Sequence, residues 1–91
     1  PGMLVLPVDL TQLQARACLQ MLMHGLRLEQ GAVVVMDAAA LSRFDSAALA
    51  VLLEFRRAGL ASGKKLAIRA MPQRLRDLAT LYGIGELLPS D

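Results

Sequence analysis

The chain has 91 residues, which is enough for one domain around a single hydrophobic core. Its residues are 55% hydrophobic but only 3% aromatic, so aliphatic side chains must build that core. The longest apolar run, residues 47–53, is far shorter than the roughly 18 residues that span a bilayer. We expect a cytoplasmic protein that forms one domain over residues 1–91, with Pro1 and Gly2 as a candidate expression remnant.

The residues that usually carry catalysis or hold metals are sparse. Cys18 is the single cysteine and lies among apolar neighbours, while His24 is the single histidine and falls in a polar stripe. The sequence contains no glycine-rich phosphate loop and no recognisable nucleophile–base pair. We therefore expect no enzymatic activity, no bound metal and no cofactor.

The formal net charge of +2 is unevenly distributed. Residues 43–77 contain eight Lys or Arg against three acids. No predicted helix carries a dense basic face, so an acidic protein partner or a solvated surface fits this half better than nucleic acid. Direct nucleotide binding by the basic half remains a further hypothesis.

Along the first half of the chain, apolar spacing predicts a strand over residues 3–6, ended by Pro7. A helix follows, capped by Asp9 or Thr11 and running to about residue 28. The apolar side of this helix should contain Leu10, Ala17, Met21 and Leu28, widened by Ala15, Cys18, Leu22 and Leu26. The polar stripe should consist of Gln12, Arg16, Gln20, His24 and Arg27.

The second half repeats the strand–helix pattern. The spacing predicts a buried strand over residues 32–36, a helix from Asp45-Ser46 to about residue 62, and a strand over residues 65–70 whose alternation leaves one face partly wet. A last helix should begin with Pro72 at its first position and end at Gly83 in a left-handed cap, before one more turn at residues 87–88. Consecutive strand–helix–strand units favour parallel pairing, so the expected fold class is α/β.

An acid and a hydroxyl open the second helix. Asp45 can cap the unsatisfied N–H groups at the helix N-terminus, and Ser46 would place a phosphate in the same field. Asp37 ends the preceding strand and should lie at the same edge of the sheet. Two interpretations stay open, because Asp45 and Ser46 can form an ordinary cap or a recognition site.

Apolar residues of this second helix cover more than the ~100° arc that one-sided packing needs. One stripe contains Leu49, Leu52, Leu53 and Leu60, and the other contains Ala48, Val51, Phe55 and Ala58. The second stripe is covered either by neighbouring helices or by another protein.

The apolar strand ending in Asp37, the Asp45-Ser46 pair, residues 49–53 and Gly63 together resemble the STAS domain family, over residue 32 to the C-terminus. Within that family, residues 78–83 followed by Leu87-Leu88-Pro89 look most like the branch that serves bacterial phospholipid-transport ABC complexes. The resemblance implies a small mixed or parallel sheet with helices mainly on one face.

The resemblance also implies binding to the ATPase subunit of such a complex without chemistry of its own, and contact with the inner membrane only through that complex. The alternative is an anti-sigma-factor antagonist that an anti-sigma kinase switches by phosphorylating Ser46. The residues expected in partner binding or regulation are Asp37, Arg43, Asp45, Ser46, Ala47 and Leu49, with Ser46 as the candidate phosphorylation site.

Overall fold

The computed structural model describes residues 3–88 of the chain. Its elements in chain order are β1 (Met3–Val5), β2 (Asp9–Leu10), α1 (Ala15–Leu28), β3 (Val33–Asp37), β4 (Arg43–Phe44), α2 (Ser46–Ala61), β5 (Lys65–Arg69), α3 (Gln73–Leu81) and the 3₁₀ turn η1 (Gly85–Leu87). The three long predicted helices and the three predicted strands are all present. The candidate expression remnant, Pro1 and Gly2, lies outside the described residues, as does Pro89.

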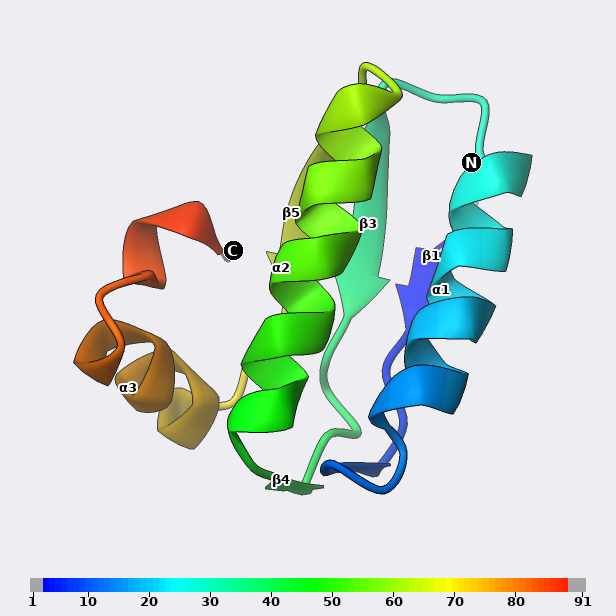
Figure 1. The fold of residues 1–91 in the computed structure, drawn as a ribbon. Helices are drawn as coiled ribbons and strands as arrows, with labels where there is room; N and C mark the ends of the chain where they lie inside the picture. Colours follow the sequence, from blue (N-terminus) through cyan, green and yellow to red (C-terminus); the bar gives the residue numbers. More distant parts are fainter. Residues whose placement is uncertain (1–2, 89–91) are drawn as a thin grey trace.

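The main sheet is parallel and has the strand order β1-β3-β5. Its register pairs Met3 with Val35 and Val35 with Ala67. Helices α1 and α2 lie side by side over one face of this sheet, and α3 lies beyond β5 (Figure 1). The predicted α/β class, the parallel pairing and the one-sided helix layer are therefore confirmed.

The core fills the space between the helix layer and the sheet. Its largest fully buried side chains include Leu22 from α1, Phe55 from α2 and Ile68 from β5. The opposite face of the sheet carries the exposed side chains of Met3, Val5 and Val33. This difference between the two faces follows from the alternation of side chains along each strand, as the sequence predicted for β5.

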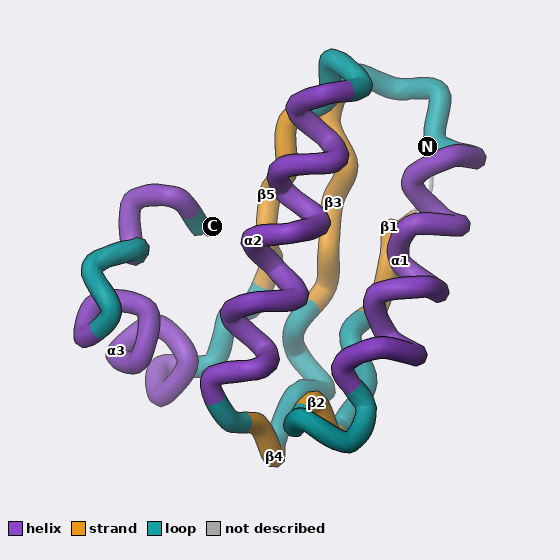
Figure 2. Tube along the Cα trace, in the orientation of Figure 1, coloured by secondary structure: helices purple, strands orange, loops and turns teal. Residues whose placement is uncertain are grey.

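A second, two-stranded sheet was not predicted. Strands β2 and β4 pair in parallel through Asp9–Arg43 and Leu10–Phe44, and they lie at the end of the molecule where α1 and α2 begin (Figure 2). Two residues per strand are too few to produce a periodic signal in the sequence.

The prediction that Asp9 or Thr11 caps α1 was wrong. The helix begins after Gln14, which makes no side-chain cap hydrogen bond. Asp9 lies in β2, and its carboxylate binds Arg43 instead. Thr11 belongs to the preceding turn, where its backbone N–H and its hydroxyl both donate to Gln14 Oε1.

The predicted inner face of α1 was also partly wrong. Cys18, Leu22 and Leu26, which the prediction gave as widening the apolar side, point into the core at intervals of four residues, and Leu10 is buried as predicted. Three other members of the predicted face, Ala17, Met21 and Leu28, are exposed. Gly25 lets the helix approach β1 closely, because a Cβ atom there would collide with Cδ2 of Leu4.

The end of α3 follows its prediction closely. Gly83 has φ 73° in the left-handed region, and its N–H donates to the carbonyl of Thr80 over 3.0 Å. The N–H of Ile84 donates to the carbonyl of Ala79 over 2.9 Å, which completes a Schellman motif. Pro72 is the N-cap of the helix and not its first residue, one position earlier than predicted.

Candidate functional site

Asp45 caps α2, as its position in the sequence predicted. Its backbone is extended, and Oδ1 accepts a hydrogen bond of 2.8 Å from the N–H of Ala47. The other oxygen, Oδ2, accepts from the N–H of Gln12 over 3.2 Å. One carboxylate therefore satisfies the start of α2 and also ties it to the turn that leads into α1.

Ser46 is the first residue of α2 and is exposed. Within residues 3–88 its hydroxyl has no hydrogen-bond partner, so it is free to contact a partner or to accept a phosphate. Ala47 beside it is half-buried, whereas Leu49 is almost fully buried. Asp45 and Ser46 are therefore both exposed at the N-terminus of α2, whereas Leu49, one turn further along the helix, is buried.

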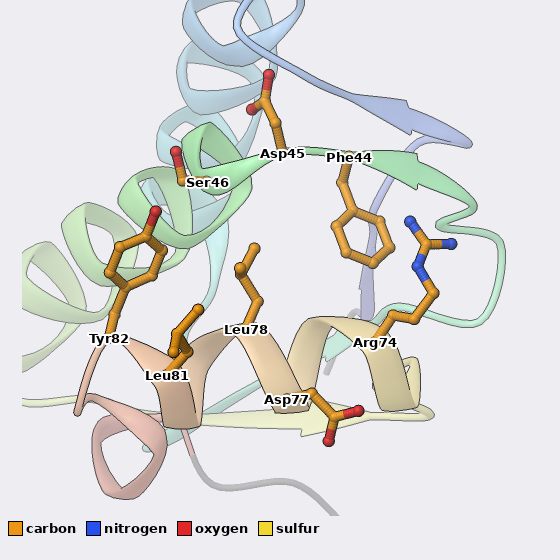
Figure 3. A pocket seen from close by; sticks show the side chains of 8 residues that line it. All are labelled: Phe44, Asp45, Ser46, Arg74, Asp77, Leu78, Leu81 and Tyr82. Carbon is orange, nitrogen blue, oxygen red and sulfur yellow. The ribbon is translucent and has the colours of Figure 1, made fainter.

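A cleft lies beside Asp45 and Ser46, between α2 and α3. Its larger hollow has a volume of about 500 Å³ and is lined by Phe44, Asp45, Ser46, Arg74, Asp77, Leu78, Leu81 and Tyr82 (Figure 3). A smaller hollow of about 330 Å³ is lined by Ser46, Leu49, Ala50, Leu53, Tyr82 and Ile84. Because both hollows share Ser46 and Tyr82, they form one concave surface, here called the α2–α3 cleft.

The wall that α3 contributes to the cleft is apolar and uncovered. Leu81 is 78% exposed and Tyr82 is 57% exposed, while Leu75 and Ala79 of the same helix are buried. Figure 3 shows the Leu78 side chain and the Phe44 ring pointing into the hollow. Exposed apolar side chains around a concavity are typical of a surface that another protein covers.

Charge in the cleft is mixed and partly satisfied. The guanidinium carbon of Arg74 lies 4.7 Å from the centroid of the Phe44 ring, a cation–π contact that holds both side chains at the rim. Asp77 accepts a hydrogen bond of 2.8 Å from Gln73 and points away from the hollow (Figure 3).

Three predicted site residues do not line the cleft, namely Ala47, Arg43 and Asp37. Arg43 forms a bidentate pair with Asp9, with Nε–Oδ1 2.8 Å and Nη2–Oδ2 3.1 Å. This hydrogen bond lowers the pKa of the Asp9 carboxyl below its ordinary value of 3.8. Asp37 accepts from the backbone N–H of Ala39 and from Arg69, both to its Oδ1 atom. Arg43 and Asp37 therefore stabilise the segments around the N-terminus of α2, where Asp45 and Ser46 lie.

Sequence reasoning missed the contribution of α3. Leu75, Leu78, Ala79 and Tyr82 are spaced three and four residues apart, so in the sequence they form one apolar stripe that does not separate its exposed members from its buried ones. Arg74 was counted only as part of the basic half. The spacing alone carries no signal that would have found this wall.

The described part of the chain contains little catalytic chemistry. Residues 3–88 include no group of three or more His, Cys, Asp or Glu that could hold a metal ion. Burial raises the pKa of the Cys18 thiol, which disfavours the reactive thiolate. None of the helices in residues 3–88 has the length and apolar content that a membrane crossing requires.

The two wide apolar stripes of α2 are mostly covered within the domain. Ala48, Val51, Leu52 and Phe55 are all buried, so neighbouring elements account for most of the arc. Leu53 lines the cleft and Leu60 is half-exposed near the other end of the helix. The apolar arc of α2 alone therefore does not provide a surface for a partner.

A parallel sheet covered by helices on one face, with an exposed helix N-terminus beside an apolar cleft, is typical of a protein-interaction domain. The family model of the STAS domain matches residues 2–89, and the chain belongs to that family. The matching model is described as "Mlab, STAS domain", so this is a STAS domain that resembles MlaB. Its family is generally non-catalytic and acts in regulatory or accessory roles through protein–protein contacts. No curated protein matches the chain.

Proposed function

We propose that this chain is a non-catalytic accessory subunit that binds and regulates the ATPase of a bacterial phospholipid-transport ABC complex of the Mla type. It works on the cytoplasmic side of the inner membrane, which it reaches only through its partner. The observation that carries the proposal is the α2–α3 cleft, exposed beside Ser46 on a domain that resembles MlaB.

The chemistry of the cleft suits a folded partner. Leu81 and Tyr82 provide exposed apolar area, and Tyr82 also offers a hydroxyl that can form a hydrogen bond once water is excluded. Ser46 lies where the two hollows meet, so a group inserted into either hollow passes close to it. The docked ATPase would cover both the α3 wall and the first turn of α2.

Capture of the ATPase tests this function. The tagged chain should retain an ABC ATPase from a lysate of its source organism, and Ser46→Glu should weaken that capture at least about tenfold because a carboxylate would be buried beside Asp45. Ser62→Glu is the matched control, since it makes the same change at the other end of α2. Equal capture by wild type and Ser46→Glu, or recovery of a sigma-regulatory kinase alone, contradicts the proposal.

The free Ser46 hydroxyl favours one second function, an anti-sigma-factor antagonist that phosphorylation switches. A phosphate there would sit at the α2 N-terminus, whose dipole favours negative charge. Incubation with a cognate kinase and ATP should then add the mass of one phosphate, and Ser46→Ala should abolish the gain. An unchanged mass with an active kinase rules out this second function.

A further inference from the structure

Helix α1 exposes an apolar stripe on the side that faces away from the core. Leu13, in the turn before the helix, is 90% exposed, Met21 is 52% exposed and Leu28 is 68% exposed. Ala17, also exposed, lies between the first two at a spacing of four residues. Residues at these spacings share one side of a helix, so they form a continuous surface, here called the α1 face.

The charged residues beside this stripe along the helix are two arginines. Arg16 and Arg27 are exposed, together with Gln12, Gln20 and His24, and residues 10–28 contain no Asp or Glu. Within residues 3–88, neither arginine forms an ion pair. The acids near the start of the helix are engaged elsewhere, because Asp9 pairs with Arg43 and Asp45 accepts from backbone N–H groups.

The charge on the α1 face decides among its possible occupants. A second copy of the chain would bring Arg16 and Arg27 against the same residues, with no Asp or Glu among residues 10–28 to offset them. Helices that bind membrane surfaces combine a denser row of cations with large apolar or aromatic anchors, whereas residues 10–28 have two arginines and no aromatic residue. A helix with an apolar stripe between carboxylates would match both features, because Met21 adapts to many shapes and arginine binds carboxylates bidentately.

We propose that the α1 face docks an acidic amphipathic helix of a partner protein. This surface is separate from the α2–α3 cleft, since α1 and α3 lie on opposite sides of α2 (Figure 1). The proposal therefore goes beyond the proposed function and does not depend on it. Two partners, one at each surface, would fit on the domain at the same time.

Two synthetic helical peptides of about 18 residues test the chemistry. Both carry leucines on one side, and the flanking positions are glutamate in one peptide and lysine in the other. In NMR titrations of the full chain, the glutamate peptide should shift the amide signals of residues 13–28 and leave those of residues 73–82 unchanged. The lysine peptide should bind at least about tenfold more weakly.

Paired charge reversals provide the matched variants. Arg16→Glu with Arg27→Glu should reduce affinity for the glutamate peptide at least about tenfold, and Arg56→Glu with Arg57→Glu on α2 should leave it unchanged. A photo-crosslinking residue at position 28, used in cells of the source organism, should attach to a segment with helical apolar spacing and flanking Asp or Glu. The Arg16/Arg27 variant should still capture the ATPase that Ser46→Glu releases.

Four results would overturn the proposal. They are equal binding of the two peptides, shifts confined to the α2–α3 cleft, concentration-dependent self-association through residues 13–28, and co-sedimentation with phosphatidylglycerol vesicles in place of peptide binding. Loss of ATPase capture in the Arg16/Arg27 variant would also overturn it, because the α1 face would then belong to the same interface as the cleft.

Discussion

The α2–α3 cleft and the α1 face, two exposed apolar surfaces of this domain, differ in shape and in charge. The α2–α3 cleft is concave, is built from two helices and a short strand, and contains groups of both signs. The α1 face is the convex side of one helix, and the charged groups of residues 10–28 beside it are two arginines. A concave surface with mixed polar groups is suited to fixing the orientation of one folded partner, whereas a single-signed stripe selects an amphipathic helix by its charge.

The α2–α3 cleft and the α1 face depend on the same core and on the same helix cap. Phe55 of α2 is buried beneath the helix layer, and Asp45 binds the backbone N–H groups of Gln12 and Ala47. Substitutions in the shared core should therefore affect both surfaces, and substitutions on either surface should affect only that one. The predictions below test this separation.

The largest effect is expected from Phe55→Ala. Removing a fully buried phenylalanine leaves a cavity and should lower the free energy of unfolding by about 3–5 kcal/mol, measured by urea denaturation. Both surfaces should lose binding together, because the helix layer no longer packs. Leu60→Ala on the same helix is the control, since its half-exposed side chain should contribute at most about 1 kcal/mol. Equal losses in the two variants would contradict the core described above.

Tyr82→Ala should distinguish the α2–α3 cleft from the α1 face by its effect on ATPase binding. It removes an exposed aromatic side chain from the cleft wall and should weaken ATPase binding at least about tenfold, measured by titration with the purified partner. Leu13→Ala, which shortens an even more exposed side chain on the α1 face, should leave ATPase affinity unchanged. If both variants lost affinity to the same extent, the distinction between the two surfaces would not hold.

The sequence predicted the framework better than it predicted these surfaces. Apolar runs and helical spacing located all three long helices and all three strands of the main sheet, and Asp45 and Gly83 marked helix ends through local chemistry alone. These signals are local, because each depends on neighbours within a few residues. They needed no knowledge of the tertiary fold.

The features that were missed depend on distant contacts. Strands β2 and β4 are joined by Asp9 and Arg43, which are 34 positions apart. Around α1, apolar residues occupy two sides of the helix, and only its packing in the folded chain shows which side is inner. The α3 wall of the cleft was likewise hidden, because the spacing of Leu78 and Tyr82 cannot show which members of the stripe are covered.

Asp45→Ala should have a smaller effect that spans both helix starts. The change removes the α2 cap and the hydrogen bond from Gln12, so we expect a loss of about 1–2 kcal/mol in thermal or urea unfolding. Ser46→Ala is the matched control and should change stability by no more than about 0.5 kcal/mol, because its hydroxyl makes no hydrogen bond within residues 3–88. An unchanged free energy of unfolding in Asp45→Ala would mean that backbone contacts alone hold the start of α2 against the turn before α1.

The smallest effect is expected from Asp9→Asn, on the strand pair beneath both helix starts. Arg43 lowers the pKa of the Asp9 carboxyl in the folded state, so the ion pair stabilises the protein above the ordinary pKa of 3.8 and is lost as the pH falls through the lowered value. The Tm of the variant should therefore be slightly lower than that of wild type at neutral pH and equal to it at about pH 2. The difference should shrink in high salt, because the pair is exposed. A constant Asp9→Asn difference at every pH would exclude the ion pair as its source.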